Sequence, residues 1–568
     1  MTTGAQLLVE ALQTHGVERA FCVPGESYLA VLDALYDVRD QLELVVCRQE
    51  GGACYMAEAH GKLTGKPGIC FVTRGPGATN ASIAVHTAYQ DSTPLILFIG
   101  QVGNDFVERE AFQEIDYRRM FGPMAKWVAQ IDRADRVPEF ISHAFQIATS
   151  GRPGPVVLAL PEDMLTEEVM NAARPSAYKA VQASASVEDI EQMLEMLGAA
   201  KQPLLILGGS GWTTEGCGTV RQFAERSSLP VACAFRSQDL FDNRHPCYVG
   251  DIGIGINPKL AQRVKGADVL LVIGARLDEM TTNGYTLVTA PCPVQQLIHV
   301  HAGADELGKV FQAELLINSG MPQFSRAIRD KVVDGTAWRD WTTDARSDYE
   351  KWTLPQSNVG PVQVAQIIRS LEGLVPADTI ITNGAGNYSA WVHRFYRYTG
   401  LGTQLAPKNG SMGYGVPSAV AAKLAYPQRV VISFSGDGCF LMNGQELATA
   451  CQYQANVIFI VVNNGMYGTI RLHQERNFPE RVWGTDLVNP DFAAYARAFG
   501  AHGELVTKTD DFIPALERCM NMGKPSLIEI QIDPNALTHQ ASMMELRQRA
   551  LSALGRTATL AVNDQETA

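Results

Sequence analysis

Two short polar motifs, each placed directly after an apolar run, constrain the fold of this chain most strongly. Gly436-Asp437-Gly438 follows the apolar residues 430–434 (VVISF). Asn463-Asn464 follows the apolar residues 456–462 (NVIFIVV). The segment 444–453 (GQELATACQY) between them predicts a helix, so the unit reads strand, loop, helix, strand, loop. A right-handed crossover of this kind places both loops at the carboxyl edge of one parallel sheet, where ligands bind.

The polar side chains of these two loops indicate a metal-bound phosphate. Asp437 and Asn464 would present two hard oxygens to one point, which suits a magnesium ion that carries a diphosphate. The glycines beside Asp437 would let backbone N–H groups approach phosphate oxygens closely. An Asp-Gly pair alone is commonly a plain turn. The interpretation therefore needs support from the rest of the chain.

Further motifs along the chain give this support. They are residues 48–53 (RQEGGA), 73–80 (TRGPGATN), 151–156 (GRPGPV), 410–413 (GSMG) and 484–492 (GTDLVNPDF). Together with the first two motifs, they resemble the thiamine diphosphate-dependent enzymes, in the acetolactate synthase-like (large subunit-like) branch. The resemblance extends over nearly all of residues 4–535. It implies thiamine diphosphate and Mg²⁺ as cofactors, and a 2-oxo acid and a carbonyl acceptor as substrates.

Composition agrees with a cytoplasmic enzyme that acts on small molecules. The net charge of -13 and the pI near 5.4 argue against nucleic acid or an anionic membrane as partner. No apolar run approaches the length of a membrane span. Residues 1–5 lack the charged and apolar regions of a secretory signal. The 11 cysteines form no C-x-x-C pair, so we expect reduced thiols in the cytoplasm.

The alternation of apolar runs with helical stretches predicts an α/β fold with three doubly wound parallel-sheet domains. The expected domains are pyrimidine-binding (1–170), central (188–335) and diphosphate/Mg-binding (355–540), followed by a partly disordered tail (541–568). Strands other than those named above are expected at 44–47, 69–73, 95–99, 156–160, 204–207, 269–273 and 297–300.

Glu50 is the first candidate for catalysis. It follows an expected strand and precedes a Gly-Gly pair that opens a predicted helix, 53–63. From the residues alone, it could be an acid favoured by the helix dipole. The resemblance implies instead that Glu50 hydrogen-bonds N1′ of the aminopyrimidine and so assists removal of the C2 proton of the thiazolium. The resemblance also implies that Gln113 hydrogen-bonds a substrate carbonyl or hydroxyl.

A larger set of cofactor contacts is implied by the resemblance. Met412, which could otherwise be core filler, would wedge between the two cofactor rings, and Gly410 would offer its carbonyl to the 4′-amino group. The implied metal ligands are Asp437, Asn464 and the main-chain oxygen of Met466. The full implied set is Thr73, Pro76, Asn80, Gly386, Asn387, Tyr388, Gly410, Met412, Asp437, Gly438, Cys439, Asn464, Met466, Tyr467 and Gly468.

The resemblance also implies self-association. In this family the residues that match Glu50 and Asp437 of one site belong to different subunits. We therefore expect a homodimer or homotetramer, although the sequence itself shows only that both elements are present.

The expected substrate pocket departs from the acetohydroxyacid synthase pattern at three places. His473 stands at the position of a Trp that sorts 2-oxo acids, and Met280 at that of an Arg that receives a carboxylate. The segment Glu26-Ser27-Tyr28 replaces a Gly-Gly-Ala loop. Loss of a cation and gain of Glu26 predict weaker binding of a carboxylate acceptor, although His473 fits a surface helix equally well. The implied pocket residues are Glu26, Ser27, Tyr28, Phe112, Gln113, Ile470 and His473.

The central domain raises the question of a flavin. Gly208-Gly209-Ser210-Gly211 follows a strand and could approach a nucleotide phosphate. It is not G-x-G-x-x-G, no acidic residue follows at the proper offset, and His301 stands where the family commonly has Asp. FAD is therefore possible but not favoured.

The favoured function is decarboxylation of a 2-oxo acid with carboligation to an acceptor. One alternative is a lyase that cleaves a 2-hydroxy ketone or a 2-hydroxyacyl-CoA. Another, of a different class, is a non-catalytic cofactor-binding paralogue. Intact Glu50, Asp437 and Asn464 argue against the last.

Overall fold

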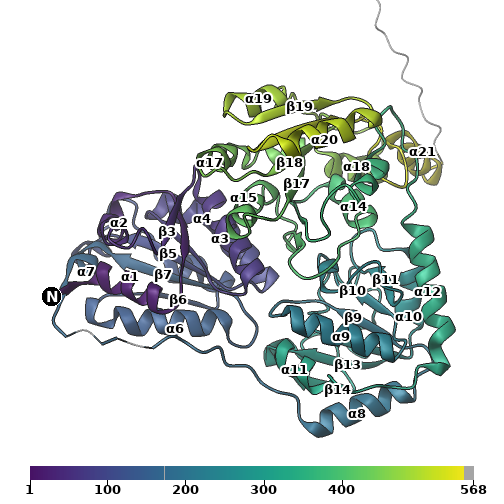
Figure 1. Cartoon of the computed structure of the whole chain (residues 1–568), viewed down its shortest axis with the longest axis horizontal. Helices are drawn as coiled ribbons and strands as arrows, with labels where there is room; N and C mark the ends of the chain where they lie inside the picture. Colours follow the sequence, from purple (N-terminus) through teal and green to yellow (C-terminus); the bar gives the residue numbers. More distant parts are fainter. Residues whose placement is uncertain (172, 175, 556–568) are drawn as a thin grey trace, which may run out of the picture.

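Three six-stranded parallel sheets form the frame of the molecule, as the alternating pattern predicts. The computed structural model describes residues 1–171, 173–174 and 176–555. In Figure 1 the N-terminal domain is purple to blue, the central domain is teal, and the C-terminal domain is green to yellow. Part of the tail predicted to be disordered, residues 556–568, lies outside the described residues.

The N-terminal sheet has the strand order β3-β2-β4-β5-β7-β6. Its strands are β2 (Arg19–Cys22), β3 (Glu43–Val46), β4 (Gly68–Val72), β5 (Leu95–Gln101), β6 (Trp127–Gln130) and β7 (Pro155–Pro161). Helices α1 (Gly4–Thr14), α2 (Leu29–Tyr36) and α6 (Val137–Thr149) pack on one face, and α3 (Glu50–Thr64) and α4 (Gly75–Asp91) on the other. Because both faces are covered, β4 and β5 are buried along their whole length.

The central sheet has the strand order β11-β10-β9-β12-β13-β14. The strands are β9 (Leu204–Leu207), β10 (Val231–Cys233), β11 (Tyr248–Asp251), β12 (Val269–Ile273), β13 (Gln296–His301) and β14 (Leu315–Asn318). Its helices are α8 (Val187–Gly198), α9 (Thr214–Arg226), α10 (Pro258–Gly266), α11 (Met321–Ala327) and α12 (Arg339–Trp352). Helix α12 leads along one side of the molecule toward the C-terminal domain (Figure 1).

The C-terminal sheet has the strand order β16-β15-β17-β18-β20-β19. The strands are β15 (Ile380–Asn383), β16 (Gln404–Leu405), β17 (Val431–Gly436), β18 (Ile458–Asn463), β19 (His502–Val506) and β20 (Ser526–Gln531). Its helices include α14 (Asn387–Phe395), α15 (Gly415–Ala425), α16 (Asp437–Phe440), α17 (Leu447–Gln452), α18 (Gly468–Asn477), α19 (Phe492–Ala498) and α20 (Phe512–Asn521). The predicted helix 444–453 is a 3-10 turn, Gly444–Glu446, that continues as α17.

The N-terminal and C-terminal domains share one hydrophobic core, in which α3 packs against α15. Polar contacts join the same helices, because the Tyr414 hydroxyl donates to Glu58 Oε2 at 2.6 Å. Tyr55 and Ser411 form a further hydroxyl pair next to the loop that carries Met412. The position of this loop therefore depends on both domains.

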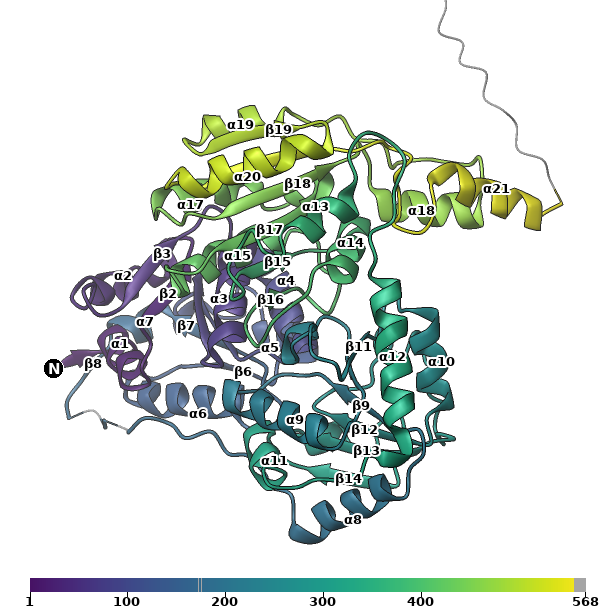
Figure 2. The ribbon, with the colours of Figure 1, turned by 45° about the vertical axis from the view of Figure 1, so that its right-hand side comes forward.

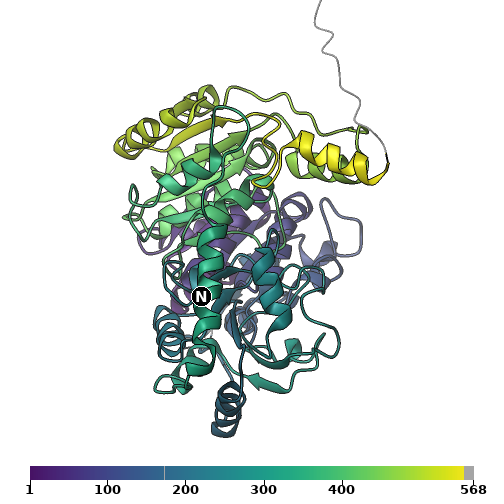
Figure 3. The same ribbon diagram turned by 90° about the vertical axis from the view of Figure 1, so that its right-hand side faces the viewer.

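Helices α18 and α21 (Met543–Ala553) pack together and extend away from the C-terminal sheet (Figure 2). The same arm stands clear of the body in Figure 3, with α21 in yellow. Glu475, fully buried, joins the two helices: its carboxylate accepts from Arg471 at 2.9 Å and from Arg547 at 2.6 and 2.7 Å. Part of the tail is thus an ordered helix that supports α18.

Across the described part of the chain, no helix has both the length and the apolar character needed to cross a membrane.

Candidate active site

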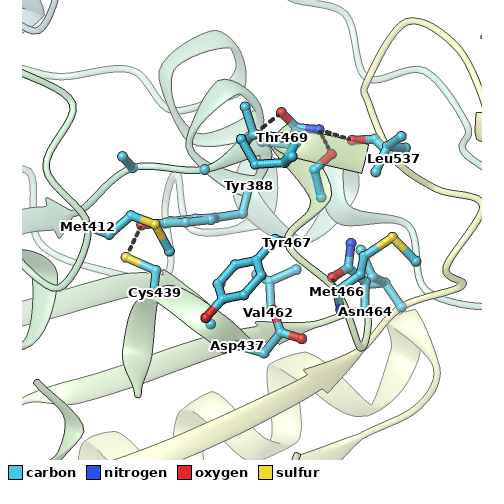
Figure 4. Close-up of a pocket in the computed structure, with 18 of the residues that line it drawn as sticks. Tyr388, Met412, Asp437, Cys439, Val462, Asn464, Met466, Tyr467, Thr469 and Leu537 are labelled. Carbon is cyan, nitrogen blue, oxygen red and sulfur yellow. Dashed lines mark hydrogen bonds between the residues drawn. The ribbon is translucent and has the colours of Figure 1, made fainter. Parts of the chain in front are cut away.

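A pocket of about 260 Å³ opens at the carboxyl edge of the C-terminal sheet. It lies between β15 and β17, where the order of the strands in the sheet reverses, which is the position at which open α/β sheets bind ligands. Every cofactor residue predicted from Gly386 to Gly468 lines this pocket, and so does Ile470. Figure 4 shows Asp437, Asn464 and Met466 toward one end and Tyr388, Met412 and Cys439 toward the other.

Asp437 begins α16 directly after β17, and its side chain is buried. Asn489 Nδ2 donates to Asp437 Oδ2 at 2.8 Å and is also 3.0 Å from Asn463 Oδ1. Burial raises the pKa of Asp437, although hydrogen bonds from backbone N–H groups and from Asn489 oppose the rise. No Lys, Arg or His among the described residues forms an ion pair with this carboxylate. A buried carboxylate that is held only by neutral N–H donors is well placed to bind a cation.

The loop that carries Asn464 is held in place by a neighbouring segment. Tyr467 N–H donates to Thr485 O, and Leu487 N–H donates to Gly465 O, each at 2.8 Å. Asn464 Oδ1 accepts from Met466 N–H at 3.3 Å, within the same loop. The motif 484–492 therefore shapes the Asn464 loop and supplies Asn489, a role that its sequence alone did not reveal.

The donor set fits Mg²⁺ better than a transition metal. No group of three or more His, Cys, Asp or Glu side chains able to hold a metal occurs in the described ranges. One carboxylate, one amide oxygen and one main-chain oxygen match an ion that keeps water ligands and takes phosphate oxygens. Asp437, Asn464 and Met466 could hold Mg²⁺ in this way.

Close packing at the floor of the pocket explains its glycines. A Cβ on Gly438 would lie 2.5 Å from the Tyr467 ring. Gly386 has φ 147°, and a Cβ there would lie 2.8 Å from the Tyr388 ring. The bare backbone of both loops can thus approach a ligand closely, as a diphosphate cradle requires.

Tyr388 and Cys439 connect three loops beneath the pocket. Gly384 N–H donates to the Tyr388 hydroxyl at 2.9 Å, and that hydroxyl lies 3.3 Å from Cys439 Sγ. Cys439 Sγ also accepts from Gly413 N–H at 3.3 Å, next to Met412. Asn387 joins two further loops, because its amide donates to Gly468 O and Leu537 O, both at 3.1 Å.

The predicted pyrimidine-side residues gather on the N-terminal domain. Glu50 is the first residue of α3, and its Oε2 accepts from Asn80 Nδ2 at 2.9 Å. Thr73, at the end of β4, has its hydroxyl 2.9 Å from that of Ser27. Pro76 is exposed at the start of α4. This cluster lies near the point in the N-terminal sheet, between β2 and β4, where the order of the strands reverses.

Glu446 of the C-terminal domain fixes the turn before Glu50. Its Oε1 accepts from the backbone N–H groups of Arg48 at 3.1 Å and Gln49 at 3.0 Å. Thr449 donates to its other oxygen at 2.6 Å. The sequence analysis did not identify Glu446, because its partners are almost 400 residues away in the chain.

Within one chain, the two clusters do not form one pocket. The pocket around Asp437 is lined only by residues between Ala385 and Leu537, so Glu50 and Asn80 lie outside it. This separation is compatible with a site that two copies of the chain complete together.

The predicted substrate residues are dispersed. Gln113, with φ 65°, accepts from Gly75 N–H through its main-chain oxygen at 3.0 Å and so lies at the start of α4. Phe112 is 70% exposed, and Glu26 and His473 are exposed as well.

Tyr28 does not face a pocket. It is buried, its ring stacks on Phe71 with centroids 5.9 Å apart, and its hydroxyl donates to Val23 O at 2.5 Å. Its prediction as a pocket residue is corrected here, because the short turn Glu26–Tyr28 directs the ring into the core of the N-terminal domain.

The glycine loop after β9 packs closely against the loop after β12. At the reversal point between β9 and β12, Gly208 N–H donates to Ile273 O at 3.1 Å, and a Cβ on Gly209 would lie 1.9 Å from Gly274 O. The two loops are in backbone contact, and the space beside Ser210, Gly274 and His301 is about 10 Å³. Gly208 and Gly209 allow this close packing, and Gly209, Ser210 and Gly211 also line a separate cavity of about 150 Å³.

Comparison with known proteins identifies the family. Residues 2–120, 190–328 and 384–530 match the N-terminal TPP binding, central and C-terminal TPP binding domains of the thiamine pyrophosphate enzymes. Acetolactate synthase isozyme 2 large subunit of Escherichia coli is 30% identical over 534 residues, 93% of this chain and 95% of that protein. The isozyme 1 large subunit of E. coli is 31% identical over 536 residues, 94% of each chain. The probable acetolactate synthase large subunit of Methanocaldococcus jannaschii is 31% identical over 549 residues, 94% and 92% of the two chains.

The fold and the pocket thus define a three-domain α/β protein with a glycine-lined pocket at the carboxyl edge of its C-terminal sheet. The chain belongs to the thiamine pyrophosphate enzyme family and is related over its whole length to acetolactate synthase large subunits.

Proposed function

We propose that this protein is an Mg- and thiamine diphosphate-dependent enzyme that decarboxylates a 2-oxo acid and joins the acyl unit to a carbonyl acceptor. The observation that carries the proposal is the buried Asp437, which has no cationic partner in the described chain and lies in a glycine-lined pocket. The relation to acetolactate synthase large subunits supports the choice of substrate class.

In this proposal, each cofactor residue has a defined task. Asp437, Asn464 and the main-chain oxygen of Met466 hold Mg²⁺, and the backbone near Gly386 and Gly438 binds the diphosphate. Met412 and Gly410 orient the two rings. When bound, thiamine diphosphate supplies the nucleophilic carbon and accepts the electrons released by decarboxylation.

Glu50 acts on the aminopyrimidine from a second copy of the chain. Its carboxylate, oriented by Asn80, holds a proton at N1′ and so assists proton movement at the 4′-nitrogen. A homodimer is the smallest assembly that brings Glu50 and Asp437 together, since the single chain keeps them apart.

We expect the enzyme to use a wider range of acceptors than a second 2-oxo acid. Met280 and His473 offer no permanent cation for a carboxylate, and Glu26 is exposed at the end of β2. Neutral aldehydes are therefore favoured as competing acceptors. A lyase that cleaves 2-hydroxy ketones or 2-hydroxyacyl-CoA would use the same groups in reverse and remains the second candidate.

Cofactor removal tests the class of enzyme. Chelation of metal followed by dialysis should abolish turnover, and thiamine diphosphate together with Mg²⁺ should restore it. Full activity in protein shown to contain no thiamine diphosphate would refute the proposal. A screen of pyruvate, benzoin-type ketols and 2-hydroxyacyl-CoA with the restored enzyme would then distinguish carboligase activity from lyase activity.

A further inference from the structure

The loop of residues 408–414 carries two residues that line the Asp437 pocket, Gly410 and Met412. The described structure assigns no helix or strand to this loop. Gly410 and Gly413 have φ values of 71° and 78°, and a glycine backbone has more conformational freedom to lose than that of any other residue. The local sequence therefore does not fix the shape of the loop, and contacts from elsewhere must do so.

Helix α4 of the N-terminal domain holds the beginning of the loop. The backbone N–H of Lys408 donates to both carboxylate oxygens of Asp91, at 2.8 and 3.1 Å. Asn409 Nδ2 donates to Thr87 Oγ1 at 3.0 Å. Asp91 and Thr87 both belong to α4 and are buried, so the loop starts from a fixed position.

Helix α3 of the same domain holds the rest of the loop. The hydroxyl of Tyr55 pairs with that of Ser411, and the hydroxyl of Tyr414 donates to Glu58 Oε2 at 2.6 Å. The two tyrosine rings are fully buried and meet edge to face, with their centroids 5.3 Å apart. Because a buried polar group that loses its partner is costly, these hydroxyl contacts favour one position of the loop.

Glu58 is itself held in place. It is fully buried, the hydroxyl of Thr93 donates to its Oε1 at 2.7 Å, and Lys62 Nζ lies 3.1 Å from the same oxygen. The other oxygen, Oε2, accepts from Tyr414. A buried carboxylate with partners on both oxygens has little freedom to move, so it can fix the end of the loop.

The positions that contact the N-terminal domain alternate with the positions that line the pocket. Residues 408, 409, 411 and 414 make these contacts, whereas 410 and 412 line the pocket. We propose that α3 clamps the loop through Tyr55 and Glu58, and that these two are positioning residues that set Gly410 and Met412 for the reaction. This role rests on the proposed function, which gives Gly410 and Met412 their task at the cofactor rings.

Loss of the clamp should affect the ring end of the pocket and not its metal end. Gly413 would keep its contacts within the C-terminal domain, because its N–H donates to Cys439 Sγ at 3.3 Å and its carbonyl accepts from Asn443 Nδ2 at 2.9 Å. The predicted Mg²⁺ ligands, Asp437 and Asn464, lie on other loops. A loosened loop would therefore leave Mg²⁺ binding intact and misplace the groups that orient the rings.

Amide hydrogen exchange of the whole protein without thiamine diphosphate tests the clamp itself. Tyr55→Phe and Tyr414→Phe each remove one hydroxyl and keep the ring, so residues 408–414 should exchange about tenfold faster than in wild type. Tyr453→Phe is the matched control: its hydroxyl also joins the two domains, accepting from Val46 N–H at 2.8 Å, but does not contact the loop. Loop exchange in Tyr453→Phe should equal that of wild type. Equal loop exchange in wild type, Tyr55→Phe and Tyr414→Phe would overturn the clamp.

The effect on the reaction is measured as C2 proton exchange of bound thiamine diphosphate. Tyr55→Phe and Tyr414→Phe should slow this exchange roughly 10- to 100-fold, while the Kd for Mg²⁺ stays unchanged. Tyr453→Phe should exchange at the wild-type rate. Ser411→Ala added to Tyr55→Phe should slow the exchange no further, because the two hydroxyls are partners of each other.

The two measurements separate the clamp from the proposed function. C2 exchange in Tyr55→Phe and Tyr414→Phe at the rate of Tyr453→Phe would overturn the positioning role, and so would a Kd for Mg²⁺ that rises in step with the loss of exchange. A loop that is loosened in both variants of a protein that does not bind thiamine diphosphate would refute the proposed function and leave the clamp intact.

Discussion

Glu446 accepts a hydrogen bond from the backbone N–H of Gln49 at 3.0 Å, and through this contact the C-terminal domain fixes the turn immediately before Glu50. The contact is tight, since a Cβ on Gly52 would lie 2.6 Å from Glu446 Oε1. The position of Glu50 therefore depends on a residue that is distant in the chain and outside the Asp437 pocket.

Glu446→Ala should slow the reaction without removing any predicted cofactor contact. In Glu446→Ala, the truncated side chain leaves the N–H groups of Arg48 and Gln49 without an acceptor. Displacement of Glu50 should slow C2 proton exchange of bound thiamine diphosphate by roughly 10- to 100-fold. Gln452→Ala, which removes an exposed contact to Arg48 across the same domain interface, is the control and should exchange normally. Equal rates in wild type and Glu446→Ala would contradict this positioning role.

Glu50→Gln tests the carboxylate itself. The amide cannot hold a proton for N1′, so C2 exchange measured by deuterium labelling should fall by ~10²–10⁴. Cofactor affinity and dimer formation should persist, because the change preserves shape and the contact to Asn80. Glu43→Gln, at a surface ion pair, serves as the control. An unchanged exchange rate would assign Glu50 a structural role at the start of α3.

Asn489→Ala should weaken the metal site. Asn489 orients Asp437 from a separate segment, and loss of such a supporting hydrogen bond commonly lowers metal affinity 10- to 100-fold. Titration of Mg²⁺ against activity and against thiamine diphosphate binding measures the effect. Asn521→Ala, on the exposed end of α20, is the matched control. Identical Mg²⁺ curves for Asn489→Ala and wild type would argue that Asp437 needs no such support.

Acceptor choice should reflect Met280 and His473. Without an Arg to receive its carboxylate, a second 2-oxo acid loses a contact of ~1.5–3 kcal/mol, roughly ten- to 150-fold in selectivity. Competition assays should therefore show poor preference for 2-oxobutyrate over pyruvate and effective use of neutral aldehydes. Met280→Arg combined with His473→Trp should shift preference toward the 2-oxo acid. A strong preference for 2-oxobutyrate in the unmodified enzyme would mean that another residue receives the carboxylate.

Glu306 should make the protein acid-sensitive. Burial tends to raise its pKa, but Arg276, Arg152 and Lys309 outweigh burial and hold the pKa at about 2, below the usual 4.5. The stability from this group is therefore fully present above pH 4.5 and is lost as the pH falls toward 2. Glu306→Gln should be destabilised at pH 7 by about 3–5 kcal/mol, because two partly buried guanidinium groups lose the buried carboxylate that they share. Urea unfolding midpoints measured at several pH values should show that the difference in stability between wild type and Glu306→Gln becomes smaller in acid. A difference that stays constant with pH would contradict the ion-pair explanation.

The sequence predicts the parallel sheets well for a physical reason. Strands such as β4, β5 and β18 are covered on both faces, so they appear as uninterrupted apolar runs. The Asp437 and Asn464 loops follow directly from these strands, and their convergence in one pocket is a consequence of parallel pairing.

Contacts between distant segments could not be predicted in this way. Asn489 reaches Asp437 only because the segment around it folds back on the Asn464 loop. Glu446 acts through main-chain N–H groups of another domain, and such contacts leave no periodic pattern in the sequence. The misassignment of Tyr28 has the same origin, because a short turn decides which way its ring points.

The functional part of the chain extends beyond the three sheets, because it includes the arm formed by α18 and α21. A protein that ended before Met543 would retain all three sheets, yet Glu475 would keep Arg471 and lose Arg547. The helix released by that loss is the one that brings Ile470 to the pocket. Helix α21 thus holds α18 beside the pocket, and a proteolytic cut near residue 543 would affect the lining of the pocket and not the hydrophobic cores.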